Sequence, residues 1–335
     1  MTEATARSTG TAMSVRDQIT QLRDYIDQRI IDQEALTLRL LIALLADGHL
    51  LVEGAPGLAK TTAIKVLAQG LEAEFHRIQF TPDLLPADLT GTEIYRPQDG
   101  SFHFQHGPIF HNLVLADEIN RAPAKVQSAL LEAMAERQVS IGRQTYPLPQ
   151  LFLVMATQNP IEQEGTYPLP EAQLDRFLMH VRVGYPNSDG ERKILHLVRE
   201  QARHEHTGPS PVSTHKVSQA TLFTARREIL DLHMAPALED YLIEIVTCTR
   251  DPSVYDAQLA RWVQYGASPR ATLALDRCAR AHAWLHDRDY VSPEDIQAIA
   301  PDVLRHRVLL SYQAEAEGVT PDQFISEILR HIAVP

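Results

Sequence analysis

Short apolar runs recur through the first part of the chain, and segments whose apolar residues follow helical spacing separate them. Runs of four to six residues fit strands that are buried on both faces of a sheet. Their alternation with helical segments predicts an α/β fold, a parallel sheet with helices on both faces. The five expected strands are residues 49–52, 75–80, 113–116, 151–155 and 178–183.

Helical patterns dominate both sides of this region. Apolar residues recur every three or four positions between residues 15 and 46, which predicts two helices before the first strand. After the turn-rich stretch 184–190 the strand signals stop, and helical patterns continue to the C-terminus. We therefore expect a disordered tail over residues 1–14, an α/β domain over 15–186 and an all-helical domain over 187–335.

Two turn sequences interrupt the alternation of strands and helices. Alternating aromatic residues surround a turn within 92–107, and a second hairpin pattern spans 138–148 across Gly142. Hairpins inserted between core elements usually project from the body of a domain. They are either decoration or elements that line a pore or grip a partner, and the sequence leaves both readings open.

Composition places the chain among globular proteins. The 335 residues are 44% hydrophobic and 22% charged, which suits two domains with their own cores. The formal net charge of -12 disfavours a broad basic face that neutralises many phosphates. Nucleic acid is therefore not an expected partner.

Compartment follows from a few further features. The longest apolar stretch, 38–46, is too short to cross a bilayer, and the first ten residues lack the apolar centre of a secretory signal. Cys248 and Cys278 stand far apart and outside metal-binding spacings, so we expect reduced thiols. These features predict a cytoplasmic protein without a membrane span.

A Gly-rich turn directly follows the first apolar run and precedes a helical segment. Backbone N–H groups of such a turn can surround phosphate oxygens, with Lys60 as a point charge and Thr61 as a hydroxyl ligand for Mg²⁺. On its own the turn is as easily structural, because turns need glycine anyway. The residues expected to contact nucleotide are Gly54, Ala55, Pro56, Gly57, Leu58, Ala59, Lys60, Thr61 and Thr62.

Two carboxylates end the third apolar run. Asp117 and Glu118 are neighbours on a strand, so one can hold Mg²⁺ while the other activates a water molecule. We assign the metal to Asp117 and the water to Glu118. The alternative is a capping role, since Pro123 marks a helix start nearby. A phosphate loop followed by this pair indicates a nucleoside triphosphatase site.

Three further polar residues stand where they could reach a phosphate. Asn159 follows the fourth run and could orient the attacking water or touch a γ-phosphate, or it could make a turn before Pro160. Arg176 precedes the fifth run and is either a charge at a helix end or an arginine finger for an adjacent subunit.

The third residue, Arg270, follows Ser268 and Pro269, which mark a helix start. A cation is electrostatically unfavourable at the positive end of a helix dipole unless an anion lies in front of it. We expect that anion to be a phosphate bound between the two domains. The alternative is an arginine side chain that extends into solvent.

In this order the loop, Asp117 with Glu118, Asn159, Arg176 and Arg270 resemble the Walker A, Walker B, sensor 1, arginine finger and sensor 2 elements of AAA+ ATPases. Three longer strings look like the MoxR family within that group. Ala59 is also common in that family's loop, whereas Asp32 stands where we expect glycine. The strings are TPDLLPADLTGT at 81–92, ADEINRAP at 116–123 and ATQNPIEQEGTY at 156–167.

The resemblance implies a P-loop nucleotide-binding domain followed by a helical lid, and ATP and Mg²⁺ as cofactors. It implies a ring, expected to be a hexamer, that holds nucleotide between neighbouring subunits and remodels a protein client. A von Willebrand factor A domain protein is an expected partner. In this reading Lys60, Glu118, Asn159 and Arg176 are catalytic. A nucleotide-gated scaffold with little hydrolysis and a nucleic-acid motor are the alternatives.

Overall fold

A five-stranded parallel sheet forms the centre of the protein. The computed structural model describes residues 13–142, 144–161, 165–205 and 216–335. The strand order is β2-β5-β8-β1-β9, and each neighbouring pair is parallel. The predicted sheet is confirmed, with boundaries within three residues of those expected. Its strands are β1 (Leu50–Gly54), β2 (Phe75–Gln79), β5 (Leu113–Asp117), β8 (Leu153–Gln158) and β9 (Met179–Val183).

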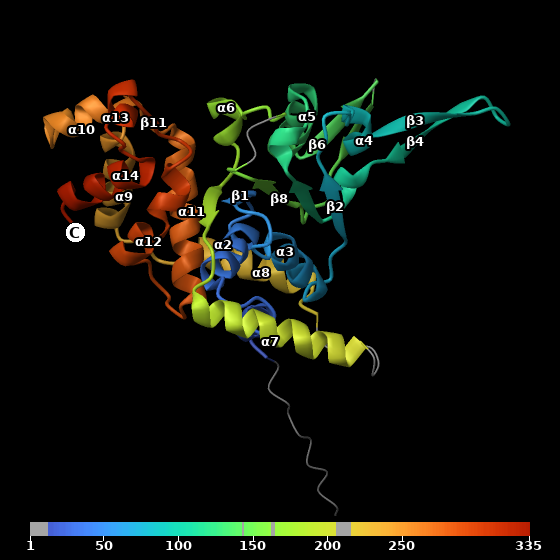
Figure 1. The fold of residues 1–335 in the computed structure, drawn as a ribbon, viewed down its shortest axis with the longest axis horizontal. Coiled ribbons are helices and arrows are strands. Elements are labelled where there is room, and N and C mark those ends of the chain that lie inside the picture. The colour runs from blue at the N-terminus through green and yellow to red at the C-terminus, as the bar shows by residue number, and fades with distance from the viewer. Residues whose placement is uncertain (1–12, 143, 162–164, 206–215) are drawn as a thin grey trace, which may run out of the picture.

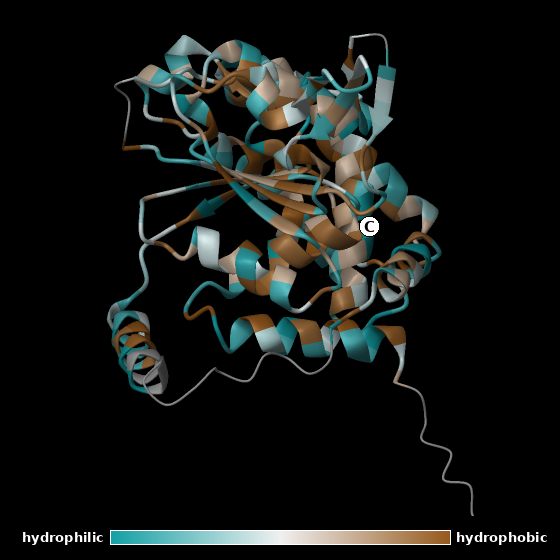
Figure 2. Cartoon of the chain, turned by 90° about the vertical axis from the view of Figure 1, so that its right-hand side faces the viewer, coloured by the Kyte–Doolittle hydropathy of each residue, from teal (hydrophilic) through white to brown (hydrophobic). Residues whose placement is uncertain are grey.

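Alternation along the strands divides the apolar core between two faces of the sheet. Leu50 and Val52 join one buried cluster, and Leu51 between them joins the other. Helices α1 (Val15–Asp27), α2 (Glu34–Leu45) and α3 (Lys60–Gln69) contribute to the first cluster, and α5 (Ala124–Glu136) contributes to the second. Figure 2 shows the apolar residues concentrated in these central strands. The sheet is therefore covered on both faces, as predicted.

The chain beyond β9 is almost entirely helical (Figure 1). Ser268, Ser292 and Thr320 are the N-caps of three of these helices, and a proline follows each as the first helical residue. The helices are α7 (Ser188–Glu205), α8 (Gln219–Leu230), α9 (Pro236–Cys248), α10 (Ala257–Trp262), α11 (Pro269–Leu285), α12 (Pro293–Leu304), α13 (Tyr312–Ala316) and α14 (Pro321–His331).

One detail corrects the expectation of an all-helical C-terminal part. Strand β10 (Val263–Tyr265) pairs with β11 (Leu309–Leu310) in a small antiparallel sheet. Helix α8 contacts α1 and α2 as well as α11, so elements from both ends of the chain pack together beneath the central sheet (Figure 1). The division of the domains at residue 186 stays a prediction.

The N-terminal tail also stays a prediction, because residues 1–12 lie outside the described part of the chain. Ser14 belongs to the folded structure. Its hydroxyl accepts the Asp17 N–H at 3.0 Å, while the Asp17 carboxylate accepts the Ser14 N–H at 3.3 Å. This reciprocal capping box begins α1.

Both predicted hairpins are confirmed. Strand β3 (Gly91–Arg96) pairs with β4 (Ser101–His106), and β6 (Gln138–Ile141) pairs with β7 (Gln144–Pro147). The β3–β4 hairpin projects far from the body of the protein (Figure 1). Phe104 of β4 stacks on Tyr146 of β7 with ring centroids 4.1 Å apart, so the two hairpins are joined at their bases.

The remaining elements are single turns. They are α4 (Pro86–Thr90), α6 (Glu171–Leu174), η1 (Pro108–Phe110), η2 (Ile119–Arg121) and η3 (Pro252–Val254). Within the described ranges, we find no helix that combines the length and the apolar character needed to cross a membrane.

Candidate functional site

The Gly-rich loop turns between β1 and α3 at the carboxyl edge of the sheet. Gly57 and Ala59 both adopt left-handed backbone conformations, with φ of 85° and 55°. Ala59 is the N-cap of α3 and has no polar side chain to satisfy the first N–H groups of the helix. These N–H groups are donors for an anion. Residues 56–62 line a pocket of about 430 Å³, which is within the usual range for ligand sites.

Lys60 also lines this pocket. Its Nζ donates hydrogen bonds to the carbonyl oxygen of Gly54 and, at 3.4 Å, to that of Gln158. Burial lowers the pKa of Lys60, and the nearby carboxylates of Asp117 and Glu118 oppose that shift. A polyanion in the pocket would favour the charged ammonium further, which is the electrostatic role expected of this lysine.

Asp117, at the end of β5, shares the pocket with Thr61. Its Oδ1 accepts a hydrogen bond of 2.6 Å from the hydroxyl of Thr157 on β8. A hydroxyl and a carboxylate are hard oxygen ligands, the kind that Mg²⁺ prefers. The chemistry of Thr61 and Asp117 therefore fits a site for that ion.

Glu118 has a left-handed backbone with φ of 58°, an uncommon conformation for a residue with a side chain. Its N–H donates to the Thr157 hydroxyl at 2.9 Å. Its Oε2 accepts from Gln79 at 2.7 Å and from Arg121 at 2.9 Å. Although Glu118 precedes η2, its carboxylate does not cap that turn, so the capping alternative has no support.

Asn159 is 6% exposed and lines the same pocket. Its Oδ1 accepts the N–H of Ile161 at 3.2 Å, so the turn before residue 161 does use this side chain. That bond engages the carbonyl oxygen of the amide and leaves the NH₂ group as the chemistry available toward the pocket. The structural and functional readings of Asn159 are therefore compatible.

Sequence reasoning missed a group of polar residues that contact the two carboxylates. Arg77 donates to Asp117 Oδ2 from Nη2 at 2.7 Å and from Nε at 3.1 Å. Gln79 lies two positions further along the same edge strand and binds Glu118. An arginine and a glutamine at alternate positions of a short strand were the available signal, because alternate residues share one face. The group consists of Arg77, Gln79, Arg121 and Thr157.

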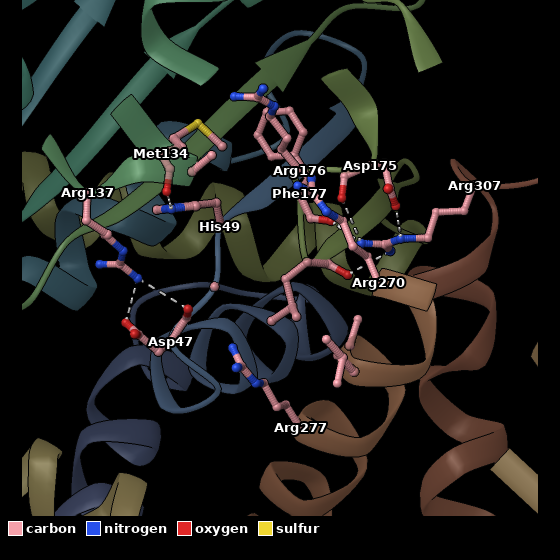
Figure 3. Close-up of a pocket in the computed structure, with 15 residues that line it drawn as sticks. Asp47, His49, Met134, Arg137, Asp175, Arg176, Phe177, Arg270, Arg277 and Arg307 are labelled. Atoms are coloured by element: carbon pink, nitrogen blue, oxygen red, sulfur yellow. Dashed lines mark hydrogen bonds and ion pairs between the residues drawn. The ribbon is translucent and has the colours of Figure 1, made fainter. Parts of the chain in front are cut away.

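Arg176 and Arg270 line a different pocket, of about 340 Å³ (Figure 3). Arg176 precedes β9, and its Nη1 donates to the Leu131 carbonyl at 2.6 Å. Arg270 is the second residue of α11, where the Ser268 hydroxyl accepts its backbone N–H at 3.2 Å. Arg137, Arg277 and Arg307 also line this pocket, so its five arginines outnumber its two carboxylates, Asp47 and Asp175. We call it the arginine pocket.

The arginine pocket and the loop pocket lie at opposite ends of the parallel strands. His49, directly before β1, and Leu178, directly before β9, line the arginine pocket, whereas the loop follows the carboxyl end of β1. Five strand residues span about 16 Å. Among the described residues the two pockets share no lining residue. Arg270 therefore does not join its own chain's loop, contrary to the expectation of a phosphate between two domains of one chain.

Asp32 stands where we expected glycine, and its backbone conformation shows why glycine would fit there. It has a left-handed backbone with φ of 59°, a conformation that glycine adopts most easily. The carboxylate compensates by accepting the N–H of Asn187 at 3.1 Å, just before α7.

Comparisons with known proteins agree with this geometry. Residues 49–179 match the ATPase family associated with various cellular activities (AAA), and residues 259–328 match the AAA lid domain. Chaperone MoxR1 of Mycobacterium tuberculosis is 47% identical over 308 residues, which cover 91% of this chain and 79% of that protein. Protein MoxR of Methylorubrum extorquens is 33% identical, with 92% of each chain covered.

A crystal structure of a candidate ATPase from Cytophaga hutchinsonii superposes with a TM-score of 0.87 at 47% identity and covers 96% of each chain. Identity at this level, over nearly the full length and across both matched domains, extends well beyond the nucleotide loop. The chain belongs to the MoxR family of AAA+ ATPases.

Proposed function

We propose that this protein is a Mg²⁺-dependent ATPase that assembles into a ring and uses hydrolysis to remodel a partner protein. One observation carries the proposal. The loop pocket brings together Lys60, Thr61, Asp117 and Glu118. Arg176 and Arg270 lie together in the arginine pocket, at the opposite ends of the strands. A complete phosphoryl-transfer site therefore needs the loop pocket of one subunit and the arginine pocket of another.

Within one subunit, the N–H groups at the start of α3 and the ammonium of Lys60 bind the phosphates of ATP. Thr61 and Asp117 hold Mg²⁺, which neutralises charge on the phosphate oxygens. Glu118 accepts a proton from the attacking water and therefore exchanges its bonds with Gln79 and Arg121 for one with water. The Asn159 amide group donates to that water or to the γ-phosphate.

The neighbouring subunit supplies Arg176 and Arg270. Guanidinium groups stabilise the charge that spreads over the γ-phosphate oxygens in the transition state. A contact between opposite edges of identical subunits is heterologous, and such contacts close into rings when the rotation permits. We propose a hexamer, as the family resemblance implies.

The β3–β4 hairpin supports a protein client. Its projecting end exposes Tyr95 by 53% and Phe102 by 67%, and their ring centroids are 5.3 Å apart. Exposed aromatic pairs of this kind are typical of protein contacts. A von Willebrand factor A domain protein is the partner that the family resemblance favours. The free, buried thiols of Cys248 and Cys278 support a reducing compartment, the cytoplasm.

The test combines ATP turnover with light scattering on the wild type and Glu118→Gln, in Mg²⁺, with and without nucleotide. We expect both proteins to bind ATP and to assemble, and turnover to fall at least about a hundredfold in the variant because the water loses its base. Unchanged hydrolysis in Glu118→Gln would remove Glu118 from the mechanism. A wild type that stays monomeric while hydrolysing ATP would contradict the shared site.

A further inference from the structure

Arg77 places a positive charge beside Asp117 in the loop pocket. Its guanidinium binds Asp117 Oδ2 through two nitrogens, and the Thr157 hydroxyl binds Oδ1. Both oxygens of the carboxylate assigned to Mg²⁺ are therefore engaged. The Asp117 side chain is 13% exposed, whereas that of Arg77 is 51% exposed.

This difference in exposure distinguishes a permanent bond from an exchangeable one. Thr157 is buried on the central strand β8, so its hydroxyl can remain on Asp117 when the site fills. Arg77 stands on the edge strand β2 with half its side chain in solvent, so its guanidinium can leave without exposing buried surface. Oδ2 is accordingly the oxygen that a second cation can take.

We propose that Arg77 is a placeholder for Mg²⁺: it neutralises Asp117 in the metal-free protein and must withdraw when the ion is bound. The inference rests on the proposed function of the loop pocket. Two cations on one carboxylate oxygen repel each other, so the guanidinium and the ion compete. Arg77 is therefore a positioning residue that sets the Mg²⁺ concentration at which the site loads.

The competition also reaches Glu118. The same Nη2 of Arg77 that binds Asp117 donates to Gln79 Oε1 at 2.9 Å, and Gln79 Nε2 donates to Glu118 at 2.7 Å. Withdrawal of Arg77 from Asp117 removes one support of the amide that holds Glu118 in its resting position.

The contacts that Arg77 makes are not ones that the protein needs in order to fold. The Arg77 side of the pair is 51% exposed, which limits what the pair contributes to stability. When Arg77 is removed, Asp117 keeps its bond from Thr157 and the nearby charge of Lys60. Arg77→Ala is therefore a usable test. The matched control is Arg182→Ala, which removes a 45% exposed arginine from β9, the other edge strand, where it pairs with Glu53 and Asp322.

The experiment measures binding of a fluorescent ADP analogue to the full chain, first in EDTA and then with increasing Mg²⁺. We expect the Mg²⁺ concentration at half-saturation to fall about three- to tenfold in Arg77→Ala, as loss of a competing charge-assisted pair predicts. Arg182→Ala should stay within about twofold of the wild type. Affinity in EDTA should be unchanged in both variants.

Three results would overturn the inference. They are an unchanged or raised Mg²⁺ requirement in Arg77→Ala, an equal shift in Arg182→Ala, and a loss of nucleotide affinity in EDTA, which would make Arg77 a phosphate ligand. Failure of the proposed function looks different. In that case the wild type itself would not bind the analogue or would not respond to Mg²⁺.

Discussion

The buried guanidinium of Arg307 donates a 2.8 Å hydrogen bond from Nε to Oδ1 of Asp175. Oδ2 of the same carboxylate accepts the hydroxyl of Ser268, the N-cap of α11, at 2.9 Å. Arg307 also donates to the carbonyl of Phe177 at 2.6 Å. Asp175 thus fixes the start of α11, which carries Arg270, beside Arg176, so the geometry of the arginine pocket depends on this ion pair.

Asp175→Ala should lower the free energy of unfolding by about 3–5 kcal/mol, because it leaves the buried Arg307 charge with backbone carbonyls but no carboxylate partner. Burial lowers the pKa of Arg307, and Asp175 opposes that shift, so the pair is electrostatically coupled. Urea unfolding measures the change. Asp189→Ala breaks an exposed pair with Arg192 and should cost less than about 1 kcal/mol. Equal losses in the two variants would show that Asp175 has no special role.

Arg176→Ala and Arg270→Ala should each lower turnover of the assembled protein by about a hundredfold or more, since both remove transition-state charge. Because the arginine pocket lies at the far edge of the sheet, nucleotide affinity of the separated subunit should stay within about twofold of the wild type. Arg227→Ala, an exposed arginine of α8, is the control and should keep full turnover. A large loss of affinity in a dilute, monomeric Arg270→Ala would mean that Arg270 acts within its own chain.

Ala59→Gly should raise the free energy of unfolding by about 0.5–1 kcal/mol, because the residue is held at φ of 55°, where a Cβ is strained. Ala129→Gly makes the same substitution in the middle of α5 and should lower stability by about 1 kcal/mol. Chemical unfolding of the two variants under one condition decides the matter. Destabilisation by both substitutions would contradict the strain assigned to the loop.

His49 should make stability fall on the acid side of neutrality. Its Nδ1 accepts the Val154 N–H at 3.0 Å, its Nε2 lies 3.3 Å from the Met134 carbonyl, and burial lowers its pKa to about 3. In the unfolded chain the group titrates near 6.5, so below that pH the unfolded state binds a proton that the folded state does not. The loss is about 1.4 kcal/mol between about pH 7.5 and 5.5.

Urea unfolding of the wild type and of His49→Gln, at about pH 7.5 and at about pH 5.5, isolates the contribution of His49 to the pH dependence of stability. Glutamine offers an acceptor and a donor but does not titrate. The difference in stability between the two pH values should therefore shrink by about 1.4 kcal/mol in the variant. An identical pH dependence in both proteins would show that His49 already titrates normally when folded.

Local sequence patterns were sufficient to predict the central strands, the two hairpins and the grouping of the loop with Asp117 and Glu118. Strands buried on both faces leave continuous apolar runs, and turn residues between alternating aromatic positions mark hairpins, so both were predictable. The loop with Asp117 and Glu118 was predictable because phosphate and metal chemistry demand those residue types at strand ends. By contrast, β10 and β11 have three and two residues, too few to produce a periodic pattern.

The positions of Arg270 and Arg77 depend on tertiary packing. Ser268 and Pro269 signal where α11 begins, but the edge of the sheet that its first turn faces is set by Asp175 and Arg307, which are distant in sequence. Arg77 likewise reads as an exposed charge on an edge strand. Its role requires the parallel pairing of β2 with β5, which brings it beside Asp117. Neither relationship has a local sequence signature.

The most direct test of the shared site mixes two variants that are each inactive alone. Lys60→Ala disables the loop pocket but keeps the arginine pocket, and Arg176→Ala does the reverse. In an equal mixture of randomly assembled subunits, about one interface in four joins an intact loop to an intact arginine pocket. We predict that the mixture recovers up to about a quarter of wild-type ATP turnover. No recovery, with mixed assembly verified by light scattering and affinity capture, would contradict a site formed between subunits.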